Sequence, residues 1–314
     1  MTSIPRIAVL PGAGATVEAA AGAVVAGGGV VVDPADAEAL VWTAGGMDPD
    51  STAAALRDVL ARYRHIGWIQ LPWAGVELYA AAGLLDHGHR WTCAKGVYGP
   101  PVAEHALTLT LACLRHLKSY ARADRWTGQA GQTLFAAPVT IFGGGGITRE
   151  LIRLLGPFGA QVTVVRKRVS PLVGVHRVVG WDARDEALGG ADVVVLALAL
   201  TAETEGSFGR REFSLMPAHS SLVNVARGRH VVTDDLVAAL AGGEIAAAGL
   251  DVTEPEPLPA GHGLWSLPNC LITPHTANTE AMAVPALGRR IAENVRRFGA
   301  GEPLEGIVDP DLGY

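Results

Sequence analysis

The sequence lacks the features that mark several large classes of protein. Only three cysteines occur in 314 residues, Cys93, Cys113 and Cys270, and they form neither a CxxC pair nor an even set. This scarcity predicts a reduced protein with no disulfide and no metal site. No uncharged apolar run approaches the roughly 18 residues that a membrane span needs, and residues 1–12 contain no apolar stretch of signal-peptide length. We therefore expect a cytoplasmic protein that binds no membrane.

An excess of positive charge is also missing. Lys and Arg number 25 against 31 Asp and Glu, which gives a net charge of −6, and no helical stretch carries a basic stripe. Nucleic acid is therefore not an expected partner. Hydrophobic residues make up 49% of the chain, which is typical of a well-packed globular protein. Since 314 residues exceed the usual size of one hydrophobic core, we expect two domains.

Short β-rich runs alternate along the chain with Ala- and Leu-rich helical stretches. The expected strands are residues 6–10, 29–32, 40–43, 65–71, 91–95, 139–142, 161–165, 192–198, 221–225, 246–252 and 271–273. Most of these runs are continuously apolar rather than alternating, which indicates burial on both faces, as in a parallel sheet covered by helices. The sequence therefore predicts an α/β fold of doubly wound parallel sheets.

Two long helical segments are candidates for the domain boundaries. Residues 102–123 follow two prolines and keep helical apolar spacing, and residues 280–298 do the same, with Pro285 in the first turn or at a kink. If both segments cross between domains, residues 1–100 and 284–314 form one domain and residues 101–283 form the other. The alternative is that both are ordinary surface helices.

A run of glycines follows the expected strand at 139–142. Gly143 and Gly145 fill the first two positions of a GxGxxG pattern, and Thr148 stands at the third, where a side chain should push the next helix slightly outward. Glycines in a strand–turn–helix context let the backbone approach a pyrophosphate at the positive end of the helix. A plain tight loop is the alternative. The context favours a dinucleotide site.

A basic triplet, Arg166, Lys167 and Arg168, ends the next expected strand. Proteins that bind NAD usually have Asp or Glu here to bond the ribose 2′-hydroxyl. A carboxylate repels a 2′-phosphate, whereas arginine binds one through paired, charge-assisted hydrogen bonds. A solvated basic turn is the alternative. The missing acid favours NADP(H) over NAD(H).

Three further polar residues follow expected strands at the edge where open α/β sheets bind ligands. Arg227 follows residues 221–225, Glu256 follows residues 246–252, and His275 follows residues 271–273. Taken singly, each has a structural explanation, as an ion-pair partner, a loop carboxylate or a capping histidine. All three in a chain with a glycine turn indicate a catalytic group.

With these residues, the chain resembles the D-isomer-specific 2-hydroxyacid dehydrogenases. The resemblance covers most of the chain beyond residue 65, and residues 1–64 match only in their α/β pattern. The similar segments are residues 71–76, 102–105, 143–148, 200–204, 224–228, 249–258 and 267–275. The resemblance implies two Rossmann-like domains, with the cofactor domain inserted into a flavodoxin-like substrate domain.

The resemblance also implies roles for the polar residues. Arg227 would bind the carboxylate and the carbonyl oxygen of a 2-oxo acid. His275 would protonate that oxygen as hydride reaches C2, and would act as the base in reverse. Glu256 would orient His275 and favour its protonated form. The implied substrate contacts are Trp73, Ala74, Gly75, Val76 and Arg227, with a core position as the alternative for Trp73.

Cofactor contacts are implied around the glycine turn and at later strand ends. They are Gly143, Gly145, Gly146, Ile147, Arg166, Lys167, Arg168, Val225, Ala226 and Asp251, of which Asp251 matches the position facing the nicotinamide carboxamide. Thr148 and Arg166 depart from the family pattern, and Ala199 replaces a frequent proline. The lost proline predicts a looser wall beside the cofactor.

The expected function is the reduction of a small 2-oxo acid, such as glyoxylate or hydroxypyruvate, with NADPH. One alternative is the same chemistry on a larger or phosphorylated acid, as in phosphoglycerate dehydrogenases. Another is a non-catalytic protein that senses a nicotinamide cofactor and binds a protein partner. A formate dehydrogenase is disfavoured, because that branch has glutamine where this chain has Glu256. The resemblance further implies a homodimer formed largely by the cofactor domain, with residues 102–117 contributing.

Overall fold

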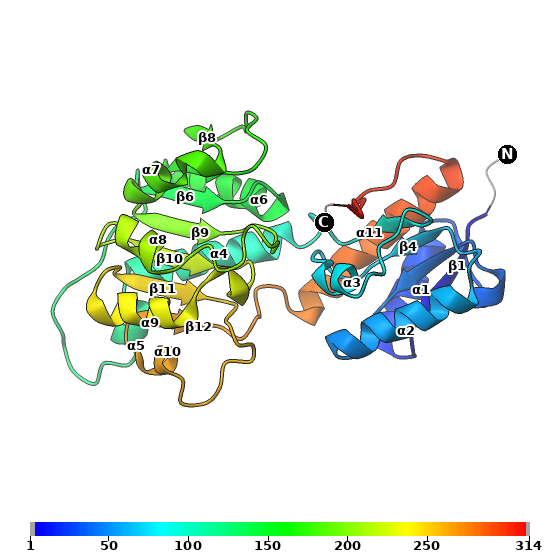
Figure 1. The fold of residues 1–314 in the computed structure, drawn as a ribbon, viewed down its shortest axis with the longest axis horizontal. Helices are drawn as coiled ribbons and strands as arrows, with labels where there is room; N and C mark the ends of the chain where they lie inside the picture. The colour runs from blue at the N-terminus through cyan, green and yellow to red at the C-terminus, as the bar shows by residue number, and fades with distance from the viewer. Residues whose placement is uncertain (1–3, 312–314) are drawn as a thin grey trace. The chain divides into compact units, whose positions relative to one another are not determined.

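The chain divides into two compact units in a computed structural model that describes residues 4–311, with only the backbone described for Pro49 and Asp50. The inserted unit is Gly99–Asn278, and the discontinuous unit combines the residues up to Tyr98 with those from Thr279 onward (Figure 1). Each unit contains one parallel sheet. Among the described residues, no helix is both long enough and apolar enough to cross a membrane.

The discontinuous unit has a five-stranded sheet in the order β2-β1-β3-β4-β5, which is the flavodoxin-like order. Its strands are β1 (Arg6–Leu10), β2 (Val30–Val31), β3 (Ala39–Trp42), β4 (Trp68–Gln70) and β5 (Arg90–Thr92). Its helices are α1 (Ala15–Ala26), α2 (Pro49–Arg62), α3 (Glu77–Ala81) and α11 (Glu280–Ala300).

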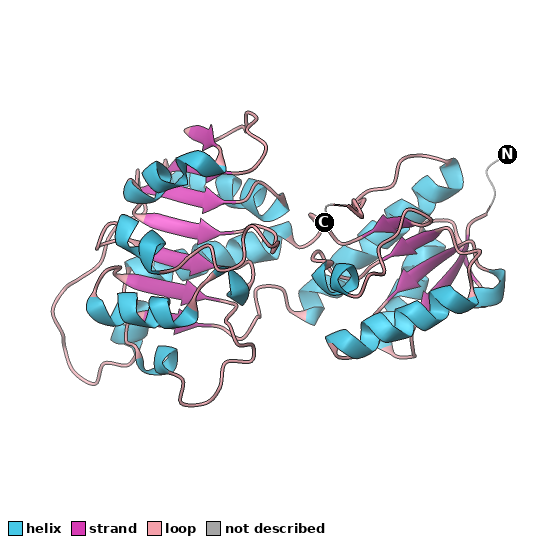
Figure 2. Ribbon diagram, in the orientation of Figure 1, coloured by secondary structure: helices cyan, strands magenta, loops and turns pink. Residues whose placement is uncertain are grey.

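Both faces of this sheet are covered by helices (Figure 2). Leu40 and Trp42 of β3 share one buried cluster with Leu56 of α2. Val41 points to the other face and belongs to a second cluster, with Val24 of α1 and residues of α11. Because successive side chains alternate between two buried faces, the strand is continuously apolar. The expectation of a doubly wound parallel sheet is confirmed.

The inserted unit has a seven-stranded parallel sheet in the order β12-β11-β10-β9-β6-β7-β8. Its strands are β6 (Pro138–Phe142), β7 (Gln161–Val165), β8 (Arg177–Val179), β9 (Val193–Leu196), β10 (Ser221–Asn224), β11 (Ala247–Leu250) and β12 (Cys270–Ile272). Its helices are α4 (Gly99–Leu114), α5 (Leu117–Ala121), α6 (Gly146–Leu155), α7 (Arg184–Gly189), α8 (Arg210–Leu215), α9 (Thr233–Gly242) and α10 (Gly263–Ser266). Read from β8, this is the Rossmann order with one added strand.

The direction of winding in the inserted unit reverses between β6 and β9. Helix α4 packs against α6 and against β10, β11 and β12. Residues of α7, α8, α9 and α10 form the large cluster on the opposite side, with Leu188, Phe213 and Leu240 among its buried members. In sheets of this kind, ligands bind outside the carboxyl ends of the strands at the reversal point. Here that point is the glycine turn after β6.

The expected single helix at 102–123 is wrong, because the chain leaves the helix after Leu114 and starts α5 at Leu117. His116 between them has φ 50°, in the left-handed region that an α-helix does not use. Lys118 anchors the new direction, since its Nζ donates to the carbonyl oxygens of Leu267 (2.8 Å) and Cys270 (2.6 Å). The apolar spacing of the sequence continues through this break, so the spacing alone does not reveal it.

One strand was not expected, and several expected strands are too long, among them those at 65–71, 91–95, 192–198 and 246–252. β8 is a three-residue edge strand whose residues are only partly buried, so it lacks the apolar run that marks the others. β9 ends at Leu196 and β11 at Leu250. The apolar residues that follow them therefore lie in loops at the ligand-binding edge.

Candidate active site

The turn after β6 requires glycine at its first position. Gly143 has φ 110°, and a Cβ there would overlap the carbonyl oxygen of Ala197 after β9. The turn leads into α6, with Gly145 as the N-cap. Backbone amides in the first turn of a helix have no partner within the helix and, together with the helix dipole, favour an anion. The turn therefore fits a pyrophosphate group.

Thr148, at the third glycine position, is fully buried in α6. Its hydroxyl donates to the carbonyl oxygen of Gly143 at 3.0 Å, so the side chain braces the turn from within. The helices approach closely at other glycines instead, since a Cβ on Gly99 of α4 would lie 3.1 Å from the carbonyl of Gly146. The outward displacement of α6 stays a prediction.

Arg166 lies directly beside the glycine turn, where a Cβ on Gly144 would be 2.8 Å from its Cδ. Its Nε donates to the carbonyl oxygen of Arg168 (2.5 Å) and its Nη2 to Ser170 Oγ (2.8 Å). Its Nη1 is buried without a hydrogen-bond partner among the described residues. A buried cationic donor normally has an acceptor, so this atom fits an anionic ligand group.

The other two basic residues of this triplet differ from Arg166. Lys167 pairs with Glu203 at 3.0 Å, and both side chains are exposed. Arg168 is exposed and contributes its carbonyl oxygen to Arg166. Of the three, Arg166 is therefore the one that the fold holds against the turn.

The segment after β9 approaches the glycine turn closely at Ala197. Thr204 Oγ1 donates to the carbonyl oxygen of Ala199 (2.8 Å) and accepts from the amide of Thr201 (2.9 Å). These bonds tie the segment back on itself without a proline at position 199. The predicted looseness of this segment stays a prediction.

Arg227 is placed by the end of β10, where Val225 and Ala226 are buried. The Asn224 side chain accepts from the amide of Ala226 (3.0 Å) and donates to the carbonyl oxygen of Arg227 (2.9 Å). A Cβ on Gly228 would overlap the carbonyl oxygen of Thr253. The backbone that carries Arg227 is therefore in direct contact with the loop that leads to Glu256.

His275 and Glu256 form a close pair. His275 Nδ1 lies 2.6 Å from Glu256 Oε1. The hydrogen bond to Glu256 raises the pKa of His275 above its ordinary value, while the positive charge of Arg227 acts in the opposite direction. The same bond lowers the pKa of Glu256. Since Glu256 takes up Nδ1, the imidazole nitrogen left for a ligand is Nε2.

Asp251 supports the loop that carries His275. Its carboxylate is almost fully buried and accepts from Thr273 Oγ1 (2.6 Å), the amide of Thr276 (2.9 Å) and the amide of Ala277 (3.0 Å). His275 has φ 51°, an unfavourable conformation for a non-glycine residue that the surrounding structure must hold. Its amide donates to the backbone oxygen of Asp251 at 2.8 Å. The contact of Asp251 with a nicotinamide carboxamide stays a prediction.

His105 on α4 belongs to the same network and received no role from the sequence. Its Nε2 lies 2.8 Å from Thr273 Oγ1 and 3.3 Å from Asp251 Oδ1. Because Thr273 donates its proton to Asp251, its oxygen is free to accept from His105. The similar segment at 102–105 pointed to this place, but a contact between residues so far apart in the chain has no local signature.

The loop after β4 lies in the discontinuous unit, and its carbonyl groups are held by residues after β5. The bonds run from Tyr98 Oη to Pro72 O (2.6 Å), from Ala94 N to Trp73 O (2.9 Å) and from Cys93 Sγ to Ala74 O (3.5 Å). Within residues 4–311, no hydrogen bond takes up the amide protons of Ala74, Gly75 or Val76. Successive unpaired amides make a cradle for an anion.

Trp73 lies in this loop and packs inward. Its ring stacks on Tyr79, with centroids 6.2 Å apart and planes inclined by 25°. Tyr79 is fully buried in the core of the unit. The side chain of Trp73 therefore has a packing role, and its contact with substrate stays a prediction.

The chain is similar in sequence and in fold to known proteins of one family. Residues 107–277 match the model of the D-isomer specific 2-hydroxyacid dehydrogenase NAD-binding domain. A glyoxylate/hydroxypyruvate reductase A of Serratia proteamaculans is 33% identical over 215 residues, which cover 67% of this chain and 68% of that protein.

Two solved structures are similar over nearly the whole chain. A D-isomer specific 2-hydroxyacid dehydrogenase of Xanthobacter autotrophicus, in complex with NADPH and MES, has a TM-score of 0.85 at 28% identity and covers 99% of this chain and 100% of that one. An NADPH-dependent glyoxylate/hydroxypyruvate reductase of Sinorhizobium meliloti, with NADP and sulfate, has a TM-score of 0.80 at 25% identity and the same coverage.

Replacing Glu256 by Gln should lower the pKa of His275. The substitution keeps the shape of the partner but removes the negative charge that stabilises the imidazolium, so His275 should lose its proton at a lower pH. An NMR titration of the His275 ring measures the change. Glu254→Gln, in the same exposed loop, is the matched control and should leave the titration unchanged. Equal shifts in the two variants would show that the loop's overall charge, rather than the 2.6 Å contact, sets the pKa.

Proposed function

This chain belongs to the D-isomer specific 2-hydroxyacid dehydrogenase family of NAD(P)-binding oxidoreductases, and we propose that it reduces small 2-oxo acids of the glyoxylate and hydroxypyruvate class with NADPH. The observation that carries the proposal is the 2.6 Å pair of His275 and Glu256 in the same unit as Arg227. A 2-oxo acid needs one proton at its carbonyl oxygen and one cation at its carboxylate. Protonated His275 and Arg227 offer these two groups.

His275 delivers the proton in this proposal. The glycine turn and the first turn of α6 would hold a nicotinamide dinucleotide, which would supply the hydride. His275 donates from Nε2 to the carbonyl oxygen, and Glu256 holds Nδ1 and stabilises the charged ring beforehand. Because reduction needs the protonated ring, the rate should fall as the pH rises through the pKa of His275. In the reverse direction the neutral ring takes the proton back.

Arg227 and the loop after β4 are the proposed carboxylate ligands. The guanidinium of Arg227 presents paired donors that match a carboxylate and the neighbouring oxygen. The amides of Ala74, Gly75 and Val76 form the proposed second contact, because no hydrogen bond among the described residues takes up their protons. The reductases of Serratia and Sinorhizobium carry glyoxylate and hydroxypyruvate in their names, which favours this substrate class over larger or phosphorylated acids.

The preference for NADPH rests on Arg166. Its buried Nη1 has no acceptor among the described residues, and the side chain lies against the glycine turn. A ribose 2′-phosphate is an anion of suitable chemistry for that donor. The Xanthobacter and Sinorhizobium structures hold NADPH and NADP respectively.

A homodimer is the proposed assembly, with residues 117–135 as its main contact. Apolar side chains of this segment are exposed, among them Leu117 (52%), Phe135 (64%) and Trp126 (99%). Helix α4, in contrast, buries most of its apolar residues within its own unit. If this segment packed against a second copy of the chain, its exposed apolar side chains would be removed from water.

Turnover should be fastest with NADPH and glyoxylate or hydroxypyruvate. The test follows NADPH and NADH absorbance separately against those two acids, pyruvate, phenylpyruvate and 2-oxoglutarate. His275→Ala should abolish reduction and leave cofactor binding intact, because only the proton donor is lost. His219→Ala is the matched control, since His219 pairs with Asp192 at 2.9 Å on the surface of the same unit. No turnover of any acid despite confirmed cofactor binding would refute the proposal and favour a sensor.

Replacing Arg166 by Asp should shift the preference toward NADH, because a carboxylate repels a 2′-phosphate and can bond a 2′-hydroxyl. The measurement is the ratio of kcat/KM for the two cofactors. Arg153→Asp makes the same charge change on the exposed side of α6 and should leave the ratio as it is. An unchanged ratio in the Arg166 variant would refute the 2′-phosphate contact.

Trp126→Ser should weaken the dimer, because it removes the most exposed large apolar side chain of the proposed contact. Sedimentation at micromolar concentration measures the assembly. Val173→Ser is the control, since Val173 is equally exposed (98%) but lies outside residues 117–135. A native protein that sediments as a monomer would refute the proposed dimer.

A further inference from the structure

Strand β5 lies at the edge of the sheet in the discontinuous unit, and the C-terminal segment completes it. Thr92 and Ile307 form an antiparallel bridge, Cys93 N donates to Gly306 O (2.9 Å), and Val308 N donates to Trp91 O (3.0 Å). An edge strand of three residues has few ladder bonds of its own. The position of the residues after β5 therefore depends on residues 305–308.

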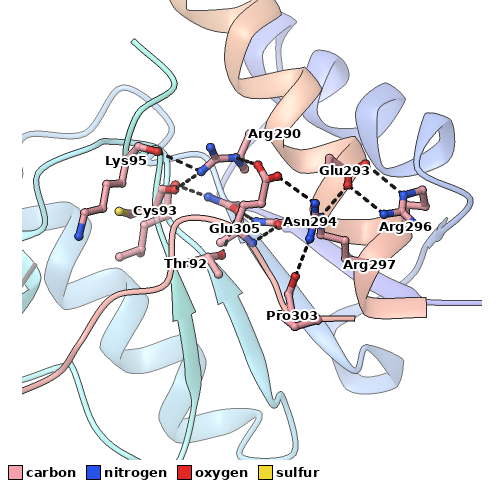
Figure 3. A network of polar contacts seen from close by, with 12 residues as sticks. Thr92, Cys93, Lys95, Arg290, Glu293, Asn294, Arg296, Arg297, Pro303 and Glu305 are labelled. Carbon is pink, nitrogen blue, oxygen red and sulfur yellow. Dashed lines mark hydrogen bonds and ion pairs between the residues drawn. The ribbon is translucent and has the colours of Figure 1, made fainter. Parts of the chain in front are cut away.

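Arg290 of α11 bonds the backbone just beyond β5. Its Nη1 donates to the carbonyl oxygens of Cys93 (3.3 Å) and Lys95 (3.2 Å), and its Nε lies 3.2 Å from Glu305 Oε2 (Figure 3). The side chain is largely buried, with 13% exposure. One guanidinium therefore joins the backbone at 93–95 to the C-terminal segment.

A second, buried connection runs beside this clamp. Asn294 is fully buried on α11, and its side chain bonds both backbone groups of Glu305 and donates to Gln70 Oε1 at 2.9 Å. Gln70 also accepts from Thr92 Oγ1 (2.9 Å) and donates to Leu71 O (2.9 Å). Helix α11 thus contacts the loop after β4 in two ways. Asn294 bonds Gln70, which directly precedes the loop, and Arg290 bonds residues 93 and 95, whose neighbours hold the loop's carbonyl groups.

We propose that Arg290, with Glu305 as its counter-charge, is a positioning residue for the substrate carboxylate. The carbonyl oxygens of residues 72–74 are bonded by residues 93–98, and Arg290 holds residues 93 and 95 from the other side. It thereby fixes the direction in which the amides of residues 74–76 point. This inference rests on the proposed binding of the substrate carboxylate by those amides.

Arginine suits this position better than lysine. A planar guanidinium donates to two carbonyl groups and a carboxylate at once in fixed directions, whereas an ammonium group on a flexible stem does not hold the same geometry. Glu305 is itself held by Arg297 at 3.0 Å, so the counter-charge is not free to move away. The arrangement transmits the position of α11 to the loop without Arg290 touching substrate.

The test replaces Arg290 by Met and uses Arg296→Met as the matched control. Arg296 lies on the same helix and, among the described residues, pairs with Glu293 and Glu302; Figure 3 shows it away from Cys93 and Lys95. In the Arg290 variant the KM for glyoxylate should rise about tenfold or more while kcat and the Kd for NADPH stay near the native values. Hydrogen exchange at Cys93 and Ala94, whose amides donate to Gly306 O and Trp73 O, should also become faster. The Arg296 variant should match the native protein in all four measurements.

Further variants guard against a general loss of stability. Glu305→Gln leaves the backbone bonds of residue 305 in place and should give a smaller change of the same kind. Arg290→Lys should restore KM only in part. A native KM in Arg290→Met, an equal rise in Arg296→Met, or faster exchange throughout the unit without a specific effect at Cys93 and Ala94 would overturn the proposal.

The exchange measurement also separates this inference from the proposed reaction. If the native protein reduces none of the acids, the proposed substrate fails, and oxamate with NADPH then serves as the carboxylate probe. Protection of residues 74–76 by oxamate in the native protein, lost in Arg290→Met but kept in Arg296→Met, supports positioning by Arg290. Absence of protection in the native protein refutes it.

Discussion

The buried Asp251 is the residue on which the geometry of the candidate active site depends. Its amide donates to Asn224 O at 3.0 Å, which joins it to the end of β10 and hence to Arg227. Its carboxylate holds the loop of His275 through Thr273, Thr276 and Ala277. A buried carboxylate without partners would be very costly, so these bonds, with His105 nearby, offset its removal from water. A negative charge placed here also favours the protonated form of His275.

Two glycines also determine the geometry of the site. Each allows the ends of two adjacent strands to approach closely. Gly143 lets the turn after β6 touch the segment after β9, and Gly228 lets the residues after β10 touch the loop after β11. In both places a Cβ would overlap a carbonyl oxygen, so the adjacent strand ends could not converge as they do. The convergence brings a helix N-terminus, a guanidinium and an imidazole to one edge of a single sheet. That edge is where parallel strands direct unpaired backbone groups and side chains.

Much of this could be predicted from the sequence, because its signals are local. The glycine turn is formed by consecutive residues. Arg227, Glu256 and His275 each follow an apolar run that forms a strand. The 2.6 Å contact of His275 with Glu256 agrees with the expected pairing, whereas their catalytic roles stay proposals. What the sequence did not predict has no local signal. The break at His116 depends on Lys118 reaching distant carbonyl groups, and β8 is too short and too exposed to show an apolar run.

The same reasoning explains why Arg290 could not be found from its neighbours in the chain. Residues 290–297 read as an ordinary charged helical face, and Arg296 fits that reading with its exposed ion pairs. Arg290 differs in being largely buried and in facing two backbone carbonyl groups after β5. The carbonyl groups of residues 93 and 95 follow β5, an edge strand, and the C-terminal segment pairs with that edge. The C-terminal segment that covers this edge is held by both Arg290 and Asn294. It thus connects α11 to the residues that hold the loop after β4.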